Sequence, residues 1–185
     1  MKGRSLDPHH LDVRKFARDV GALAGSWPLH SLKRLSATCE PALADAAMPP
    51  VTWQATGEMR GVVGGPVQVW LHLEVNATVR LLCQRCLLPL QEALSAHRSF
   101  LFVSDEAEAA RLDEELDDDV MVLSRSLDVA ALAEDELILA LPLVPRHERC
   151  PEPLTAPADS LADADVRPNP FAALETLRRP SSEGS

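Results

Sequence analysis

The sequence predicts an α+β fold, in which helices cover an antiparallel meander sheet. Three observations predict it. Residues 67–83 alternate strictly between apolar and polar side chains, as a long strand with one buried face does. Alternating segments also flank this run through short connections, which favours antiparallel pairing. A helical apolar period at residues 128–141 supplies a cover for the sheet. The pattern leaves open whether the sheet is flat or a half-open barrel.

The N-terminal part is predicted to be helical. Asp12 can cap a helix whose apolar residues recur at steps of three and four. This period predicts that the helix continues towards Leu23. Trp27 and Pro28 interrupt the pattern, and a second short helix is expected over residues 29–35. The first helix presents the apolar residues Val13, Phe16, Ala17, Val20 and Leu23.

Three strands are expected next, at residues 51–60, 67–83 and 92–103. The first two are joined through Gly64-Gly65-Pro66, a typical turn sequence. Seventeen residues exceed the usual length of a strand, so a bend or bulge is predicted near residues 74–77. His72 falls on the polar side of the second strand and is expected to be solvated.

Residues 105–119 contain nine acidic residues and one arginine, and predict a solvated, partly disordered loop. Their spacing does not match that of an EF-hand. A short strand is expected at residues 120–123. Asp128 then caps the covering helix, which Pro142 ends near Leu141.

The predicted organisation is one α+β domain over residues 1–150, with a basic N-terminal helical arm. Residues 151–168 form a flexible linker rich in Pro, Ala and Asp, which begins a disordered C-terminal tail. Residues 169–179 form a short amphipathic helix at the end of this tether. Such a helix either binds a groove on a partner or docks on its own domain. The candidate partner-binding residues are Asn169, Pro170, Phe171, Leu174, Leu177, Arg178 and Arg179.

The net charge of −10 argues against a protein that coats nucleic acid nonspecifically, because phosphate binding needs clustered Lys and Arg. The first 34 residues are an exception, with seven basic and three acidic residues. They either contact RNA locally or form a solvated helix face. The candidate RNA-contacting residues are Arg14, Lys15, Arg18, Lys33 and Arg34.

The sequence shows neither a signal peptide nor an apolar run of membrane-spanning length, so a cytoplasmic protein without membrane contact is expected. In a reducing compartment its four cysteines are expected to be metal ligands, redox groups or structural thiols rather than disulfides.

Cys83 and Cys86 form a C-x2-C motif, and His147 and Cys150 repeat its spacing. Together these residues provide four ligands of the kind that tetrahedral zinc takes, so a structural zinc site is one prediction. Reduced thiols in a turn are the other. A redox pair is a third, weaker interpretation, because no helix follows Cys86 to lower the thiol pKa, although Arg85 would favour a thiolate.

Cys39 is expected to be a small core residue. None of the sequence motifs of phosphate-binding loops, serine hydrolases or zinc proteases is present, so no catalytic residue is assigned.

Three separated segments resemble the YceD family. They begin with Cys83-Gln84-Arg85-Cys86-Leu87. The second runs over residues 133–147, from Ala133-Glu134-Asp135-Glu136-Leu137 to Pro145-Arg146-His147. The third is Arg167-Pro168-Asn169-Pro170-Phe171-Ala172-Ala173-Leu174, followed by Arg178-Arg179.

The resemblance implies a non-enzymatic cytoplasmic factor needed for accumulation or processing of 23S ribosomal RNA, and hence for ribosome biogenesis. Its partners would be ribosomal precursor RNA or large-subunit assembly proteins, with no small-molecule substrate. Some branches of the family have further downstream cysteines that indicate metal binding. Here only Cys150 lies downstream, so a four-ligand site needs His147. The alternative function is a cytoplasmic C-x-x-C thiol redox protein.

Overall fold

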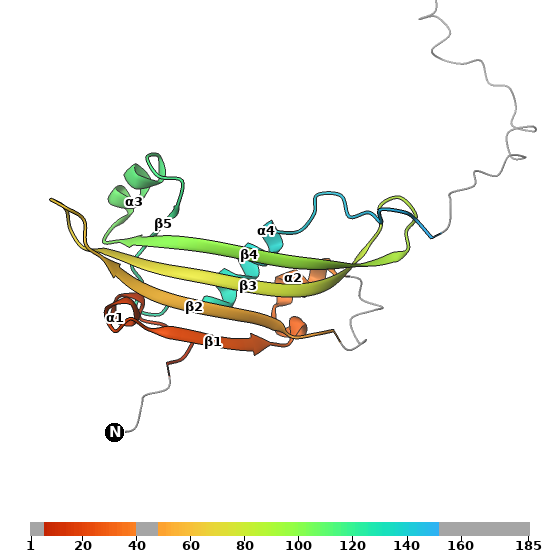
Figure 1. Cartoon of the computed structure of the whole chain (residues 1–185), viewed down its shortest axis with the longest axis horizontal. Coiled ribbons are helices and arrows are strands. Elements are labelled where there is room, and N and C mark those ends of the chain that lie inside the picture. The colour runs from red at the N-terminus through yellow and green to blue at the C-terminus, as the bar shows by residue number, and fades with distance from the viewer. Residues whose placement is uncertain (1–5, 40–47, 152–185) are drawn as a thin grey trace, which may run out of the picture. The chain divides into compact units, whose positions relative to one another are not determined.

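A computed structural model describes residues 6–39 and 48–151 of the chain. Within these ranges it forms one open, five-stranded sheet with the strand order β1-β2-β3-β4-β5 (Figure 1). The first four strands pair antiparallel, as the predicted meander requires, but β5 pairs parallel to β4. The fold is therefore α+β with a mixed sheet. The strands are β1 (Ala22–Trp27), β2 (Val51–Arg60), β3 (Gln68–Leu82), β4 (Pro89–Val103) and β5 (Asp119–Val122).

The helices cover both faces of the sheet unequally. Buried side chains of α1, α2 and α4 form one large core with one face of β2, β3 and β4, whereas α3 covers a small apolar patch on the other face. The prediction that residues 128–141 cover the sheet is thus confirmed. The helices are α1 (Val13–Arg18), the single 3-10 turn η1 (Leu29–Ser31), α2 (Lys33–Thr38), α3 (Glu106–Asp113) and α4 (Val129–Leu139).

The three central strands follow the predicted period of two. Leu71, Leu73 and Val75 on β3 are at most 1% exposed, and polar residues alternate with them. The register between β3 and β4 runs without interruption from Val69–Phe102 to Leu82–Pro89. The bulge predicted near residues 74–77 is therefore wrong. Because the register is uninterrupted, the alternating apolar residues of β3 stay on the core face, whereas Trp70 on β3 and Leu101 on β4 belong to the apolar patch on the other face.

The predicted continuation of the first helix to Leu23 is also wrong. After Arg18 the chain turns at Val20, whose φ of 48° lies in the left-handed region. It then enters β1, where the N–H of Gly57 donates to the carbonyl of Gly21 at 2.9 Å. A Cβ on Gly21 would lie 2.2 Å from the Phe16 ring, so only glycine fits here. The strand gains backbone hydrogen bonds from β2 that a helical period cannot reveal.

The predicted second helix over residues 29–35 is present in part. The chain forms η1 and then α2, which starts at Lys33 and extends to Thr38. Cys39 follows with an exposure of 7%, which confirms the prediction of a small core residue.

The acidic segment contains a helix where a loop was predicted. The carboxylate of Asp105 accepts the N–H of Glu108 at 2.9 Å and caps α3. Ala109 and Leu112 pack against Trp70 and Leu101 on the second face of the sheet. This apolar contact supplies the stabilisation that a highly acidic sequence lacks by itself.

His72 is half-buried rather than solvated. Its Nδ1 lies 2.8 Å from the Ser99 hydroxyl and its Nε2 lies 3.1 Å from a carboxylate oxygen of Glu58. Both partners come from neighbouring strands, so the sheet register rather than the local sequence sets this environment.

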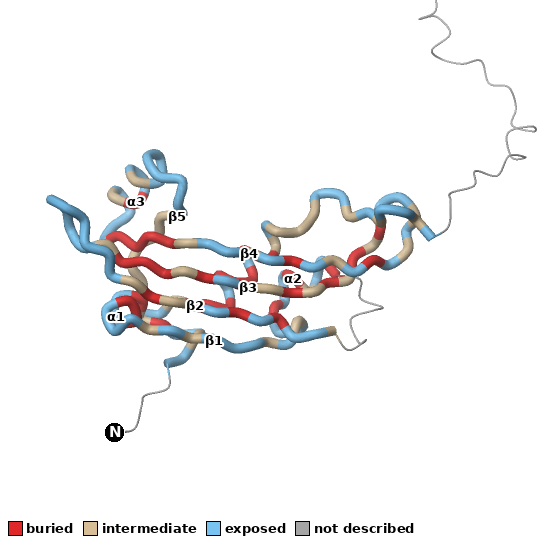
Figure 2. Tube along the Cα trace, viewed as in Figure 1, coloured by how far each residue is buried: buried red, intermediate tan, exposed pale blue. Residues whose placement is uncertain are grey.

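The burial pattern changes along the sheet (Figure 2). Its strands are buried mainly where α1, α3 or α4 covers them, whereas most of β1 is exposed. In the ranges described, no helix has the length and apolarity needed to cross a bilayer.

Candidate metal centre

Four predicted ligands meet at the end of the sheet where β3 turns into β4. The ligand atoms of Cys83, Cys86, His147 and Cys150 all lie within 4.8 Å of one another. Cys83 and Cys86 belong to the β3–β4 turn, while His147 and Cys150 lie in the segment after α4. The cluster therefore joins two parts of the chain about sixty residues apart in sequence.

The β3–β4 turn directs both of its sulfurs towards the cluster. The N–H of Cys83 donates to the carbonyl of Leu88 and continues the β ladder, while the N–H of Leu87 donates back to the carbonyl of Cys83 at 2.9 Å. Leu87 has a φ of 58°, a left-handed conformation that a branched residue adopts only when its surroundings impose it. The tight turn places two thiols beside each other.

The segment after α4 is held against this turn by its backbone. The N–H of Gln84 donates to the carbonyl of Pro145 at 2.9 Å. The imidazole Nε2 of His147 lies 3.1 Å from the carbonyl of Pro89, and this contact requires a proton on Nε2. Nδ1 then keeps a free lone pair and lies 3.4 Å from the sulfur of Cys86. Such an outer hydrogen bond is usual for a histidine that binds a metal.

The spacing of the four atoms fits a tetrahedral ion. With Zn–S bonds of about 2.3 Å, two ligand sulfurs lie roughly 3.8 Å apart. The sulfurs of Cys83 and Cys150 are separated by 3.8 Å. Three cysteines and one histidine are a common ligand set of structural zinc. The four residues could thus bind a metal ion, and the donor chemistry favours zinc.

The surroundings of the cluster shift the pKa values of Cys83 and Cys86 in opposite directions. Burial of Cys83 opposes its charged form, but N–H groups of Cys86, His147 and Arg85 donate to its sulfur and lower the pKa of the thiol to about 5. Burial instead raises the pKa of Cys86. The Nε of Arg85 lies 3.0 Å from the sulfur of Cys150, so a positive charge already faces the cluster.

A second joint, between α2 and α4, was not predicted. Glu134 of α4 is 7% exposed, and its carboxylate accepts the backbone N–H of Arg34 at 2.6 Å and that of Leu35 at 3.1 Å. These are N–H groups of the first turn of α2, whose own N-cap residue, Leu32, provides no side-chain acceptor. Glu134 thus caps α2 from a helix about one hundred residues away.

The Arg34 side chain completes this joint. Its Nε donates to Glu134 at 3.0 Å, and the guanidinium also pairs with Asp135 and reaches the carbonyl of Ala131. These contacts raise the pKa of Arg34, with the hydrogen bond to Asp135 as the largest cause. This predicted RNA contact is therefore already engaged within the domain. The acidic triplet at residues 134–136, in an otherwise apolar helix, was the available sequence signal.

Another buried carboxylate connects α4 to the sheet. Glu136 is 6% exposed and accepts the Nε of Arg98 on β4 at 3.1 Å. The two buried acidic residues of α4, Glu134 and Glu136, thus each have a cationic partner, as buried carboxylates require.

The remaining basic candidates lie on two separate helices. Arg14, Lys15 and Arg18 are exposed on α1, and Lys33 is exposed on α2. Figure 1 shows these two helices at different positions along the sheet. The seven tail candidates from Asn169 to Arg179 lie outside the described residues.

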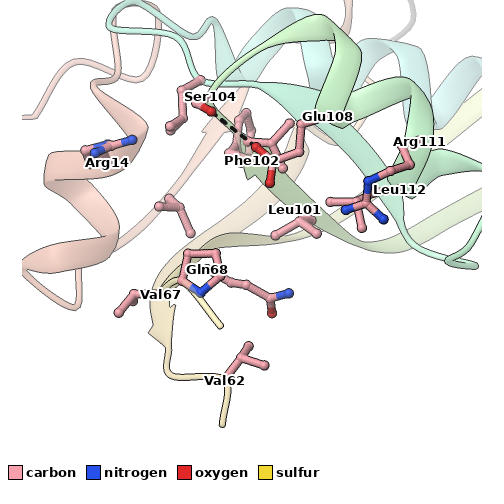
Figure 3. Close-up of a pocket in the computed structure, with 14 residues that line it drawn as sticks. Arg14, Val62, Val67, Gln68, Leu101, Phe102, Ser104, Glu108, Arg111 and Leu112 are labelled. Atoms are coloured by element: carbon pink, nitrogen blue, oxygen red, sulfur yellow. Dashed lines mark hydrogen bonds between the residues drawn. The ribbon is translucent and has the colours of Figure 1, made fainter. Parts of the chain in front are cut away.

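Arg14 also lines a pocket of about 270 Å³ near α3 (Figure 3). Leu101, Phe102 and Leu112 provide apolar parts of its wall, while Glu108 lies near Ser104, whose hydroxyl is 3.2 Å from the Glu108 carboxylate. Among its lining residues no set of groups has catalytic geometry.

Comparisons with known proteins show which family the chain belongs to. The family model "Large ribosomal RNA subunit accumulation protein YceD" matches residues 71–178. A protein of that name from Haemophilus influenzae is 29% identical over 176 residues, which cover 93% of this chain and 96% of the relative. No solved structure matches. The family match covers most of β3, all of β4, the four candidate ligands and α4, and extends into the C-terminal residues. The chain belongs to the YceD family.

Proposed function

We propose that this chain is a non-catalytic cytoplasmic factor that supports accumulation of 23S ribosomal RNA of the large subunit by binding. The observation that carries the proposal is the match to the YceD family, together with the nearly full-length similarity to a relative named for large ribosomal RNA subunit accumulation. The chemistry of the candidate site agrees with it, because four protein ligands leave no coordination position open for a substrate.

In this proposal zinc has a structural role. Cys83, Cys86, His147 and Cys150 hold the ion, which closes the connection between the β3–β4 turn and the segment after α4. Metal binding then adds to the stability of the fold, because the complete ligand set exists only in the folded chain. The rigid end of the sheet serves recognition rather than chemistry.

Recognition would use the exposed basic residues of α1 and α2 together with the tail. Arg14, Lys15, Arg18 and Lys33 have exposed side chains that would contact phosphate, with Arg18 first leaving its exposed ion pair with Asp19. The partner would be precursor RNA or a large-subunit assembly protein. The short motif over residues 169–179 is the proposed anchor for a partner groove. In this proposal the tail attaches the chain to its partner, and α1 lies close to RNA.

The test is complementation of a strain that lacks this gene. The ratio of 23S to 16S ribosomal RNA should fall in the deletion strain and return with the wild-type chain. A variant with Arg14→Ala, Lys15→Ala and Arg18→Ala and a chain lacking residues 167–179 should each restore the ratio only in part. A chain with Arg60→Ala, Arg111→Ala and Arg149→Ala loses the same number of exposed positive charges outside the N-terminal segment and is the control for loss of charge.

Crosslinking decides whether the contact with RNA is direct. Ultraviolet crosslinking in cells should recover precursor RNA of the large subunit with the wild-type chain, and less with the triple α1 variant. An unchanged 23S level in the deletion strain would overturn the proposed function. A reduced level without any crosslinked RNA would leave an assembly protein as the partner.

The second candidate function is a thiol redox protein that uses Cys83 and Cys86. Arg85, which lies inside the C-x-x-C motif, favours it, and so does the thiol of Cys83, whose pKa, despite burial, is lowered to about 5 by N–H groups that donate to its sulfur. In such a reaction the two thiols would reduce a disulfide of the partner and form a disulfide themselves. The geometry is unfavourable, because Cys83 is 0% exposed and lies at a strand end rather than at a helix N-terminus. A Cys86→Ser variant that accumulates a mixed disulfide with a cellular protein would support the redox function.

A further inference from the structure

Strand β1 has an outer edge that no other strand of the described residues pairs with. The N–H of Gly57 bonds to the carbonyl of Gly21, and the same register continues to Trp27–Val51. In an antiparallel ladder, alternate residues direct both backbone groups to the same neighbouring strand. Residues 21, 23, 25 and 27 therefore bond β2. The residues that direct their N–H and C=O groups away from the sheet are Ala22, Ala24 and Ser26.

The outer side of β1 is accessible. Ala22, Ala24 and Ser26 are exposed, and no further backbone hydrogen bond reaches them from the described part of the chain. In Figure 1, β1 forms the lower border of the sheet with no strand beyond it. The edge thus offers three N–H and three C=O groups to another strand.

The opposite edge of the sheet consists of the four-residue strand β5 and the part of β4 that β5 does not pair with, and its features discourage pairing more than those of β1. Part of the outer edge of β4 is covered by β5, and the remainder carries Pro89, Glu92 and Arg98. Proline and charged residues on an edge strand are the usual devices that prevent pairing with another chain. The sequence of β1, Ala-Leu-Ala-Gly-Ser-Trp, contains neither.

We propose that β1 pairs antiparallel with β1 of a second copy of this chain, about a two-fold axis through Ala24. In this register Ala22 faces Ser26 of the other copy, and Ala24 faces its own counterpart. All of the outward backbone groups then find a partner, three N–H and three C=O groups from each chain. The two five-stranded sheets become one continuous sheet.

The side chains fit this symmetry on both faces. On one face the paired residues are alanine or serine, whose small side chains leave room for close approach. On the core face Leu23 lies opposite Gly25 of the other copy, and Trp27 lies opposite its Gly21. Each large side chain therefore faces a glycine rather than another large one. A foreign strand would need this same pattern of large and small residues, whereas a second copy supplies it.

Electrostatics does not oppose the pairing. The chain carries a net charge of −10, which would repel two copies at most surfaces. Strand β1 has no ionisable side chain, and the nearby Arg18 and Asp19 form an ion pair with each other at 3.6 Å. Since the contact is one short strand, we expect a micromolar rather than nanomolar Kd.

Sedimentation equilibrium of the full chain tests the proposal. The average mass of the wild-type protein should rise with concentration from 20.1 kDa towards twice that value. Ala24→Pro removes an outward N–H but none that bonds β2, and should keep the mass at one chain. Ala24→Thr retains the N–H and should dimerise as the wild type does.

A covalent test remains valid if Ala24→Pro fails to fold. In Ala24→Cys the two new thiols face each other across the axis, where paired Cα atoms lie about 5.5 Å apart, within disulfide reach. Mild oxidation should give a crosslinked dimer. Ala93→Cys is the matched control, because Ala93 is exposed on β4, away from β1.

Each outcome decides the proposal. Concentration-dependent mass in wild type and Ala24→Thr, together with crosslinking at position 24 but not 93, supports it. A wild-type chain that stays monomeric throughout overturns it. A dimer that persists in folded Ala24→Pro, or that crosslinks equally at position 93, also overturns it, because the interface would then lie elsewhere.

Discussion

The joint at Glu134 and the cluster around Cys83 both hold distant segments of the chain together, but through different chemistry. Both connect α4 or the segment after it to elements far away in sequence. The carboxylate of Glu134 accepts hydrogen bonds from backbone N–H groups and from the guanidinium of Arg34. The chain itself therefore supplies the donors and the positive charge that this carboxylate needs. The cluster instead gathers three thiols and an imidazole, and the positive charge that contacts them within the described part of the chain is that of Arg85.

The two joints should therefore differ in how their stability depends on metal ions in solution. Ligand thiols must lose their protons to bind a metal, so a full set of thiolates is stable only when a cation is bound. The stability contributed by the cluster should therefore change with zinc and chelators. The carboxylate joint should not respond to either.

The largest effect is expected at the metal cluster. Cys83→Ser should abolish binding of one zinc ion per chain and lower the Tm by roughly 8–16 °C, the linkage expected when free zinc is about 1,000 times Kd. Metal analysis and thermal unfolding of untagged protein, purified under reducing conditions, provide the measurement. Chelation of the wild type should reproduce the shift.

Cys39→Ala is the matched control for this prediction. Cys39 is also buried, but its sulfur contacts the carbonyl of Leu35 at 3.4 Å and lies outside the cluster. This variant should retain zinc and its response to chelator. Equal metal content in wild type and Cys83→Ser would show that the cluster is not the binding site.

The next largest effect is expected at the α2–α4 joint. Glu134→Ala removes the acceptor of two first-turn N–H groups of α2, and should lower the free energy of unfolding by about 2–4 kcal/mol. Glu134→Gln retains an oxygen acceptor and loses only the charge, so its loss should be about half as large. Urea unfolding measures both, and the chelator response should stay as in wild type. Identical losses in the two variants would contradict the capping role.

The smallest effect is expected at the pair between Arg98 and Glu136. Arg98→Met removes the donor but retains an apolar stem, and should cost about 1–2 kcal/mol because solvent reaches this half-exposed side chain. Adding Glu136→Leu should recover part of the loss, since no unpaired carboxylate then stays buried. The double-mutant cycle gives the coupling energy, and a value of zero would exclude a stabilising pair.

Several features of the chain follow from its sequence alone. The period of two located β2, β3 and β4, because alternating side chains suit only a sheet with one buried face. Asp128 and the apolar period predicted α4, whose first turn the Asp128 carboxylate does cap. The C-x2-C and H-x2-C spacings named all four residues of the cluster, since ligand type and local spacing are properties of the sequence.

Tertiary structure decided the features that depend on distant partners. Residues 22–27 form a strand because β2 offers backbone hydrogen bonds. The acidic helix α3 forms because its apolar residues pack on the apolar patch around Trp70. Only the fold brings His147 and Cys150 to the β3–β4 turn, and only the fold converts Glu134 into the cap of α2. Periodicity and caps act within a few residues, whereas these contacts cross sixty to one hundred residues, and their partners are fixed by packing.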